Sequence, residues 1–144
     1  MQIIIQDPAP GEDDRIVVSV RHMTENVVRA IALLKSPSGL TVYDGDGALL
    51  LSPQEIFYCE SVDLKTFVYA EKSVYRSRLK LYEVEESLAE QDFLRVSKQA
   101  LVNVKKIKRV APHDGGRFVA TLANDERLII SRQYVPALKG RFGL

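Results

Sequence analysis

The stretch that decides the fold is Phe93-Leu94-Arg95-Val96-Ser97-Lys98-Gln99-Ala100-Leu101-Val102-Asn103. Leu94 and Val96 on either side of Arg95 indicate a half-buried strand, because successive side chains of a strand point to opposite faces. Downstream, short alternating segments are separated by the turn signals Asp114-Gly115-Gly116 and Asn124-Asp125. Short strands at regular spacing with turns between them predict a mainly antiparallel β architecture with short helices.

The basic residues are concentrated in the same region. Residues 93–144 contain eleven Lys or Arg and three acidic residues, a net charge of +8, whereas the whole chain carries only +1. Residues 1–52 carry −3 and residues 53–92 carry −4. Clustered positive charge on strands with interleaved Val, Ile and Phe is typical of a protein that binds the phosphate backbone of a nucleic acid. A solvated basic face without a ligand is the competing interpretation.

The order of residues in this region resembles the LytTR family of bacterial transcription-factor DNA-binding domains. The family pattern runs Phe-x-Arg-Val-His-x-Ser-x-x-Val-Asn, then an Ile, then Ser-Arg after a pair of strands; Ile107 and Ser131-Arg132 take the last places here. Residues 55–60 resemble the opening strand of that domain and residues 81–88 its Leu-rich helix, so the resemblance covers residues 53–144. Ser97 stands where the family has His and Gln99 where it has Ser. The resemblance therefore does not carry a base preference over to this chain.

In the LytTR family, loops rather than a recognition helix enter successive major grooves of duplex DNA. The resemblance places three loops at the DNA, and we expect base contacts from Lys65, Thr66, Lys98, Gln99 and Arg132. Arg and Lys can donate to guanine in the major groove, and Gln can bond adenine. We expect phosphate contacts from Ser97, Lys105, Lys106, Lys108, Arg109, Ser131 and Gln133.

The resemblance implies a cytoplasmic bacterial transcriptional regulator that binds promoter repeats in double-stranded DNA, as a homodimer at least on the DNA. The resemblance implies a stand-alone form of the output domain of a response regulator, without a receiver domain. In this family such proteins are often inhibited by a membrane protein. Two alternatives stay open, an RNA-binding module and a protein-binding β module. Binding of single strands relies on aromatic stacking, and the basic region offers only Phe118, Tyr134 and Phe142 besides Phe93 at its start.

We expect residues 1–52 to form a small α+β extension in front of a DNA-binding domain at residues 53–144. The β-branched residues 15–20 predict a strand. An apolar stripe of Val27, Val28, Ile31 and Leu34 predicts a helix that Thr24 caps and Ser36-Pro37 ends. Asp44-Gly45-Asp46-Gly47 predicts a hairpin. The extension is too short for a receiver domain, so it serves either dimerisation or the binding of a regulator.

The remaining residues indicate no catalysis, no cofactor and no metal. Cys59 is the only cysteine, which excludes an internal disulfide, fits a reducing compartment and favours a buried apolar role. His22 and His113 have no further ligand near them, and the Asp44-x-Asp46 pair lacks the later ligands of a calcium loop. No apolar run reaches the roughly 20 residues that a membrane span needs. The start of the chain does not resemble a signal peptide.

Overall fold

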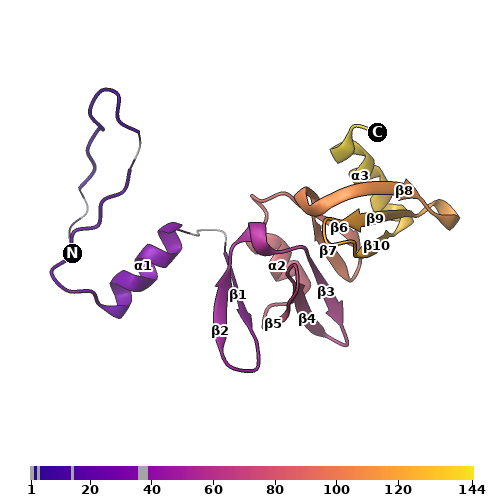
Figure 1. Ribbon diagram of the computed structural model, residues 1–144, viewed down its shortest axis with the longest axis horizontal. Helices are drawn as coiled ribbons and strands as arrows, with labels where there is room; N and C mark the ends of the chain where they lie inside the picture. Colours follow the sequence, from indigo (N-terminus) through magenta and orange to yellow (C-terminus); the bar gives the residue numbers. More distant parts are fainter. Residues whose placement is uncertain (1, 3, 14, 36–38) are drawn as a thin grey trace.

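The computed structural model describes the chain except residues 1, 3, 14 and 36–38. In the described part, the strands form two sheets in which every pairing is antiparallel. The large sheet has the order β2-β1-β5-β4-β3-β7-β6 and the small sheet the order β10-β9-β8 (Figure 1). The prediction of a mainly antiparallel β protein with short helices is therefore confirmed.

The strands are β1 (Leu40–Tyr43), β2 (Ala48–Leu51), β3 (Tyr58–Val62), β4 (Lys65–Tyr69), β5 (Val74–Ser77), β6 (Phe93–Ser97), β7 (Ala100–Asn103), β8 (Ile107–Pro112), β9 (Phe118–Leu122) and β10 (Arg127–Ile130). The α-helices are α1 (Glu25–Lys35), α2 (Leu81–Ser87) and α3 (Val135–Phe142). Single 3-10 turns lie at η1 (Pro53–Glu55), η2 (Val104–Lys106), η3 (Asp114–Gly116) and η4 (Arg132–Tyr134).

One face of the large sheet packs against α2. Leu81, Val84 and Leu88 recur at helical spacing and are buried in one cluster with residues of β1, β3, β4 and β7. Cys59 belongs to this cluster and is fully buried, as the sequence predicts. Burial raises the pKa of the Cys59 thiol to about 12, so the side chain is a neutral apolar group that fills space.

The other face of the large sheet is covered only over β3, β7 and β6. There it packs against the small sheet and α3, which Figure 1 shows together at the C-terminal side of the molecule. Tyr58 and Tyr69 face each other across β3 and β4, and their rings stack with centroids 4.2 Å apart. Val135 and Leu138 of α3 close this second core. The half of the face formed by β4, β5 and β1 stays open to solvent.

The predicted hairpin of residues 40–51 is confirmed. The Asp44 carboxylate accepts hydrogen bonds from the backbone N–H groups of Asp46 and Gly47, at 2.8 and 3.0 Å. Tyr43 of β1 lies opposite Arg76 of β5, so the hairpin is part of the large sheet. The predicted division of the chain after residue 52 stays a prediction. The hairpin before that point is paired through β1 with β5, which follows it in the sequence.

The N-terminal region differs from the prediction in its strand. The helix predicted after Thr24 is confirmed as α1, and the residues predicted to end it, 36–37, lie outside the described part of the chain. The strand predicted over residues 15–20 was wrong, because these residues have no regular structure. A β-branched run forms a strand only where a neighbouring strand pairs with it, and the described residues supply none here. Ile16 and Val17 are each 71% exposed.

Candidate nucleic-acid interface

Strand pairing brings two of the predicted loops to the same end of the large sheet. The β3–β4 turn contains Asp63 and Leu64, and the β6–β7 turn contains residues 97–99. β3 and β7 are neighbours, with Glu60 opposite Ala100, and the backbone N–H of Ser61 donates to the Gln99 carbonyl at 2.8 Å. The two turns therefore lie side by side, although 34 positions separate Leu64 from Lys98.

The third predicted loop joins them through β6. The backbone N–H of Ser131 donates to the Val96 carbonyl at 2.8 Å, next to the β6–β7 turn. Arg132 follows and lies against the β8–β9 turn, where a Cβ added to Gly116 would meet its Cδ at 2.8 Å. We call residues 63–65, 97–99, 114–116 and 131–133 together the loop end of the molecule. The three loops that the resemblance predicts are thus gathered on one side.

The β3–β4 turn has an unusual backbone. Asp63 and Leu64 have φ values of 50° and 63°, a left-handed conformation that bulky residues rarely adopt. Two such residues make the tight turn that matches the twist of neighbouring strands. The turn leaves the Leu64 side chain fully exposed at its tip, at the loop end. Strained positions of this kind cluster at functional sites.

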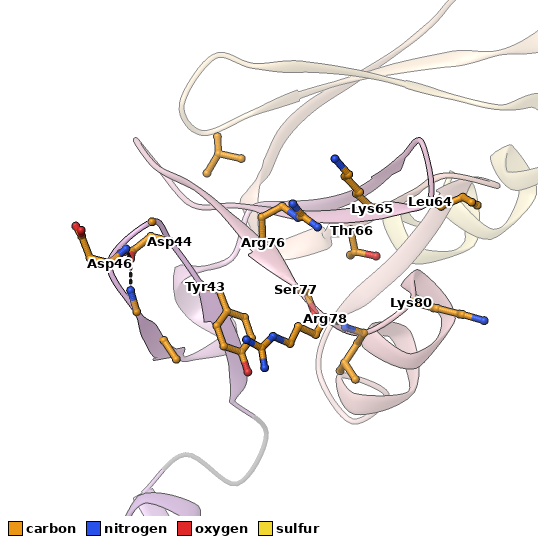
Figure 2. A pocket seen from close by; sticks show the side chains of 15 residues that line it. Tyr43, Asp44, Asp46, Leu64, Lys65, Thr66, Arg76, Ser77, Arg78 and Lys80 are labelled. Atoms are coloured by element: carbon orange, nitrogen blue, oxygen red, sulfur yellow. Dashed lines mark hydrogen bonds between the residues drawn. The ribbon is translucent and has the colours of Figure 1, made fainter.

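Lys65 and Thr66 leave β4 on opposite sides (Figure 2). Lys65 is exposed on the open face of the sheet. Thr66 is only 3% exposed and faces the α2 side. Its burial contradicts the predicted base contact, because its hydroxyl cannot reach a base edge in a major groove. The physical reason is the period of two along a strand, which reverses the facing of a side chain with each residue.

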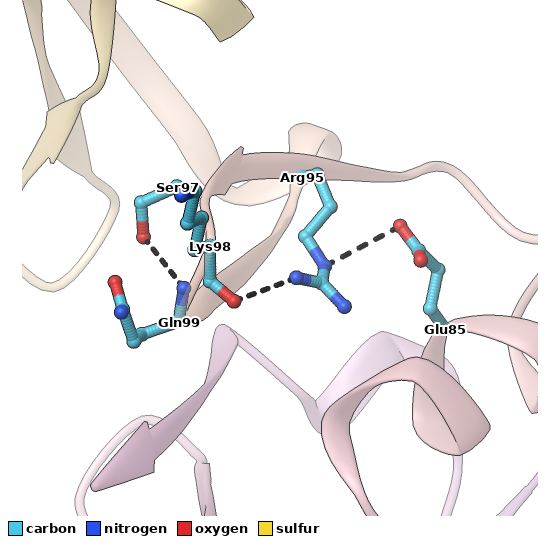
Figure 3. A network of polar contacts seen from close by, with 5 residues as sticks. All are labelled: Glu85, Arg95, Ser97, Lys98 and Gln99. Carbon is cyan, nitrogen blue, oxygen red and sulfur yellow. Dashed lines mark hydrogen bonds and ion pairs between the residues drawn. The ribbon is translucent and has the colours of Figure 1, made fainter.

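The β6–β7 turn is held in place from behind by Arg95 (Figure 3). One guanidinium nitrogen, Nη1, donates to the Lys98 carbonyl at 2.7 Å, and the Arg95 Nε lies 3.5 Å from the Glu85 carboxylate of α2. Nε makes this ion pair without the geometry of a hydrogen bond. In front, the Ser97 hydroxyl accepts from the Gln99 N–H at 3.2 Å. The turn thus presents Lys98 and Gln99 to solvent, and Arg95 has the structural role that its neighbours predict.

Arg132 sits at the start of η4 with its side chain exposed. Its aliphatic part packs on Gly116, which has φ +76°, and a Cβ there would also lie 3.2 Å from the Arg132 Cγ. The backbone N–H of Tyr134 donates to the Ser131 carbonyl at 2.9 Å and closes the turn. The absence of a side chain at Gly116 therefore leaves room for the Arg132 side chain beside the β8–β9 turn. Ser131 is half-buried and Gln133 exposed beside it.

Lys105 and Lys106 lie at the opposite end of the large sheet, which we call the far end. They follow Asn103, which pairs with Phe93 at the start of β6, whereas Ser97 at its end pairs with Ala100. The ammonium group of Lys106 lies 5.0 Å from the centre of the Phe57 ring. The structure thus does not bring these two lysines to the predicted loops.

Asn103 is the anchor of this far end. It is 4% exposed; its amide donates to the Ile56 carbonyl at 2.9 Å and to the Pro53 carbonyl at 3.3 Å. Its side-chain oxygen accepts from the Lys105 N–H at 3.1 Å and caps η2. Asn103 therefore has a structural role, because its amide ties β7 to Pro53 and Ile56, which lie about fifty positions earlier in the sequence.

Lys108 and Arg109 also belong to the far end, on β8, because the Ala123 N–H beside the β9–β10 turn donates to the Lys106 carbonyl at 2.8 Å. Lys108 forms an ion pair with Asp125, which belongs to the β9–β10 turn. Ile107 pairs with Leu122 at this end of the small sheet, whereas Pro112 pairs with Phe118 at the end near Arg132. Arg109 is exposed. A phosphate contact by Lys108 would have to compete with Asp125.

Arg117 directly borders the loop end, and the sequence assigns it no contact. It directly follows η3, its side chain is exposed, and its Nε donates to the Asp114 carbonyl at 2.9 Å. In the structure β9 begins one residue later, at Phe118. The position of Arg117 beside the Gly-Gly turn is the signal that could have revealed it.

Comparisons with known proteins identify the family and the fold. The model of the LytTr DNA-binding domain family matches residues 46–143. The chain therefore belongs to the LytTR family of DNA-binding domains. This is a family of DNA-binding domains and not of enzymes, as the sequence predicts. Within the described residues, we find no helix with the length and apolar character to cross a bilayer.

Two individual proteins are similar. A solved LytTr DNA-binding domain from Bacillus cereus superposes with a TM-score of 0.69 and 28% sequence identity, covering 74% of this chain and 97% of that one. The sensory transduction protein LytT of Enterococcus faecalis is 20% identical over 140 residues, which are 94% of this chain. The chain spans 58% of the length of that curated relative.

Proposed function

We propose that this protein is a bacterial transcriptional regulator that binds duplex DNA sequence-specifically, with its loop end in the major groove. One observation carries the proposal. Lys65, Lys98, Gln99 and Arg132, from three separate segments, are exposed on one side of the molecule. Their backbones are fixed by hydrogen bonds within the two sheets. A rigid set of donors on turns can enter a major groove, which presents a different donor and acceptor pattern for each base pair.

The side chains suit distinct contacts. Arg132 has a planar fork that can bind the O6 and N7 of guanine together, and Gly116 fixes the base of its side chain. Lys98 can donate to the same atoms as a single point charge, and Gln99 can bond the N6 and N7 of adenine. Ser97, Ser131 and Gln133 lie beside these residues and serve phosphate contacts. The far-end cations Lys105, Lys106, Lys108 and Arg109 receive less support from the geometry.

Duplex DNA is favoured over single-stranded RNA by the composition of the loop end. Residues 63–65, 97–99, 114–116 and 131–133 contain no aromatic residue, and single-strand binding relies on stacking bases on aromatic rings. Tyr58 and Tyr69 stack on each other between the sheets and are not offered to a base. The loop end therefore supports contacts to base edges in a groove.

We further propose that two copies bind adjacent promoter repeats, in the bacterial cytoplasm, and that residues 1–39 serve this pairing or a regulatory partner. The support is the exposed apolar surface of this region, where Met23 is 65% and Val28 53% exposed. A membrane-protein inhibitor is the partner that the family resemblance suggests. Measuring the mass of the full chain and of a variant without residues 1–39, free and on DNA, tests the pairing.

A salt-titrated binding assay tests the main proposal. The full chain is titrated against fragments of bacterial genomic DNA that include promoter regions, with single-stranded RNA as a competitor. We expect selective binding to some duplexes, with a slope of several units in a plot of log affinity against log salt concentration. Equal affinity for all duplexes, or displacement by RNA, would contradict it.

A further inference from the structure

A groove lined by residues from both faces of the large sheet lies at the end of β4, β5 and β1 that borders the β3–β4 turn. Strand register places Tyr43 opposite Arg76, and Arg76 opposite Phe67, so these three side chains share one face. Lys65 precedes Phe67 by two residues and lies on this face too. The groove has a volume of about 1060 Å³, and the β1–β2 turn forms its other wall (Figure 2).

The groove concentrates positive charge. Residues 53–92 have five basic residues and a net charge of −4, and four of the five line this groove: Lys65, Arg76, Arg78 and Lys80. Only Lys72 lies elsewhere, at the opposite end of the β4–β5 hairpin. The overall acidity of the segment hides the cluster in the sequence, because strand pairing and not sequence distance brings the cations together.

Aromatic rings hold the two arginines in place. The guanidinium carbon of Arg78 lies 4.1 Å from the centre of the Tyr43 ring, and that of Arg76 lies 5.5 Å from the centre of the Phe67 ring. Stacking of this kind orients a guanidinium and leaves its N–H groups free to bind an anion. Neither arginine forms an ion pair with a carboxylate in the described part of the chain.

We propose that Lys65, Arg76 and Arg78 form a phosphate-binding surface that extends the DNA contact from the loop end to the backbone beside the recognised bases. The inference rests on the proposed function. Lys65 borders the β3–β4 turn, and Arg76, which lies opposite Phe67, is on the same face as Lys65. Arg78 directly follows β5 at this end of the sheet. A duplex whose major groove receives that turn would place its flanking phosphates over this row of cations.

The opposite wall limits where the phosphates can lie. Asp44 and Asp46 stand there, and the Asp44 carboxylate is already used by the N–H groups of its own turn. Their charge repels phosphate from the β1–β2 hairpin and restricts binding to the Lys65 side. A groove that is open and charged on one side fits a polyanion that passes across it better than an enclosed small molecule.

The double variant Arg76→Gln and Arg78→Gln tests the surface, and Lys72→Gln is the matched control on the same hairpin. We expect the double variant to bind specific and random duplexes more weakly by the same factor. The slope of log affinity against log salt should fall by about 1.8 units, so that the loss of affinity between 50 and 200 mM salt is roughly 12-fold smaller than in wild type. Lys72→Gln should leave the slope unchanged.

Two further measurements separate the possible failures. The variant Arg76→Lys with Arg78→Lys keeps both charges and should restore the wild-type slope, while thermal melting verifies that all variants are folded. A wild-type slope in the glutamine double variant would overturn the phosphate-binding surface, even if binding remained selective. If the wild-type chain showed no preference among duplexes, the proposed function itself would fail, whatever the slopes of the variants.

Discussion

The two ends of this molecule use the same residue types for different purposes. At the far end, Lys106 lies over Phe57 and Lys108 pairs with Asp125. At the loop end, Lys98 and Arg132 face solvent, while Arg95 and Gly116 hold their surroundings in place. Net charge alone cannot distinguish the cations of the two ends, since all of these lysine and arginine residues contribute to the +8 of residues 93–144. We therefore expect a cation to contact DNA only where no carboxylate pairs with it and where it lies on the side of the molecule that carries the loops.

The largest effect should come from the far end and should concern stability. Asn103→Ala removes the group that bonds the Ile56 carbonyl and the Lys105 N–H in a buried site. Leaving buried polar groups without partners costs about 1–3 kcal/mol each, so we expect the free energy of unfolding to fall by about 3 kcal/mol. Urea unfolding measures it. The folded fraction should keep the wild-type preference among duplexes, and a lost preference would show that the two ends are not independent.

The next effect should come from the loop end and should concern selectivity. Arg132→Ala removes the proposed fork on guanine, so discrimination between specific and random duplexes should fall by about 1–3 kcal/mol. The free energy of unfolding should change little, because the side chain is exposed. Competition binding with both duplexes gives the ratio, and Lys106→Ala at the far end is the matched control. An unchanged ratio in Arg132→Ala would remove this residue from the base contacts.

A smaller effect on the same ratio should follow from Gly116, which has no side chain of its own to contact a base. Gly116→Ala places a methyl group 2.8 Å from the Arg132 Cδ, and its φ of +76° disfavours any side chain. The flexible Arg132 side chain can move aside, so we expect a loss of about 1 kcal/mol in discrimination and a similar loss of stability. Gly115→Ala is the control, since it has a similar φ of +72° but its nearest neighbour is 3.9 Å away. Equal discrimination in the two variants would mean that Gly116 does not orient Arg132.

The sequence predicts the strands and turns of the basic region because motif and alternation agree there. The prediction from sequence fails where the structure of a segment depends on pairing with another strand of the same chain. Residues 15–20 have strand propensity but no neighbouring strand, and Thr66 is one position away from the exposed face of β4. Arg76 and Arg78 belong to an acidic segment, and only pairing with β4 and β1 brings them to the loop end. The net charge of a sequence segment therefore does not reveal which of its cations the fold brings together on one surface.

The smallest expected effect is that of Lys108, and it tests most directly the comparison between the loop end and the far end. The sequence predicts that Lys108 holds a phosphate, and loss of such a contact lowers the salt slope by about 0.9 units. The structure places Lys108 at the far end in an ion pair with Asp125, whose side chains are 50% and 80% exposed. An exposed pair contributes about 0.2–1 kcal/mol, so Lys108→Ala should change stability by no more than that and the slope by well under one unit. Asp125→Asn, which frees the lysine, should leave the slope equally unchanged. If Lys108→Ala lowered the slope by a full unit, the duplex would reach the far end, and the distinction between the two ends would fail for this strand.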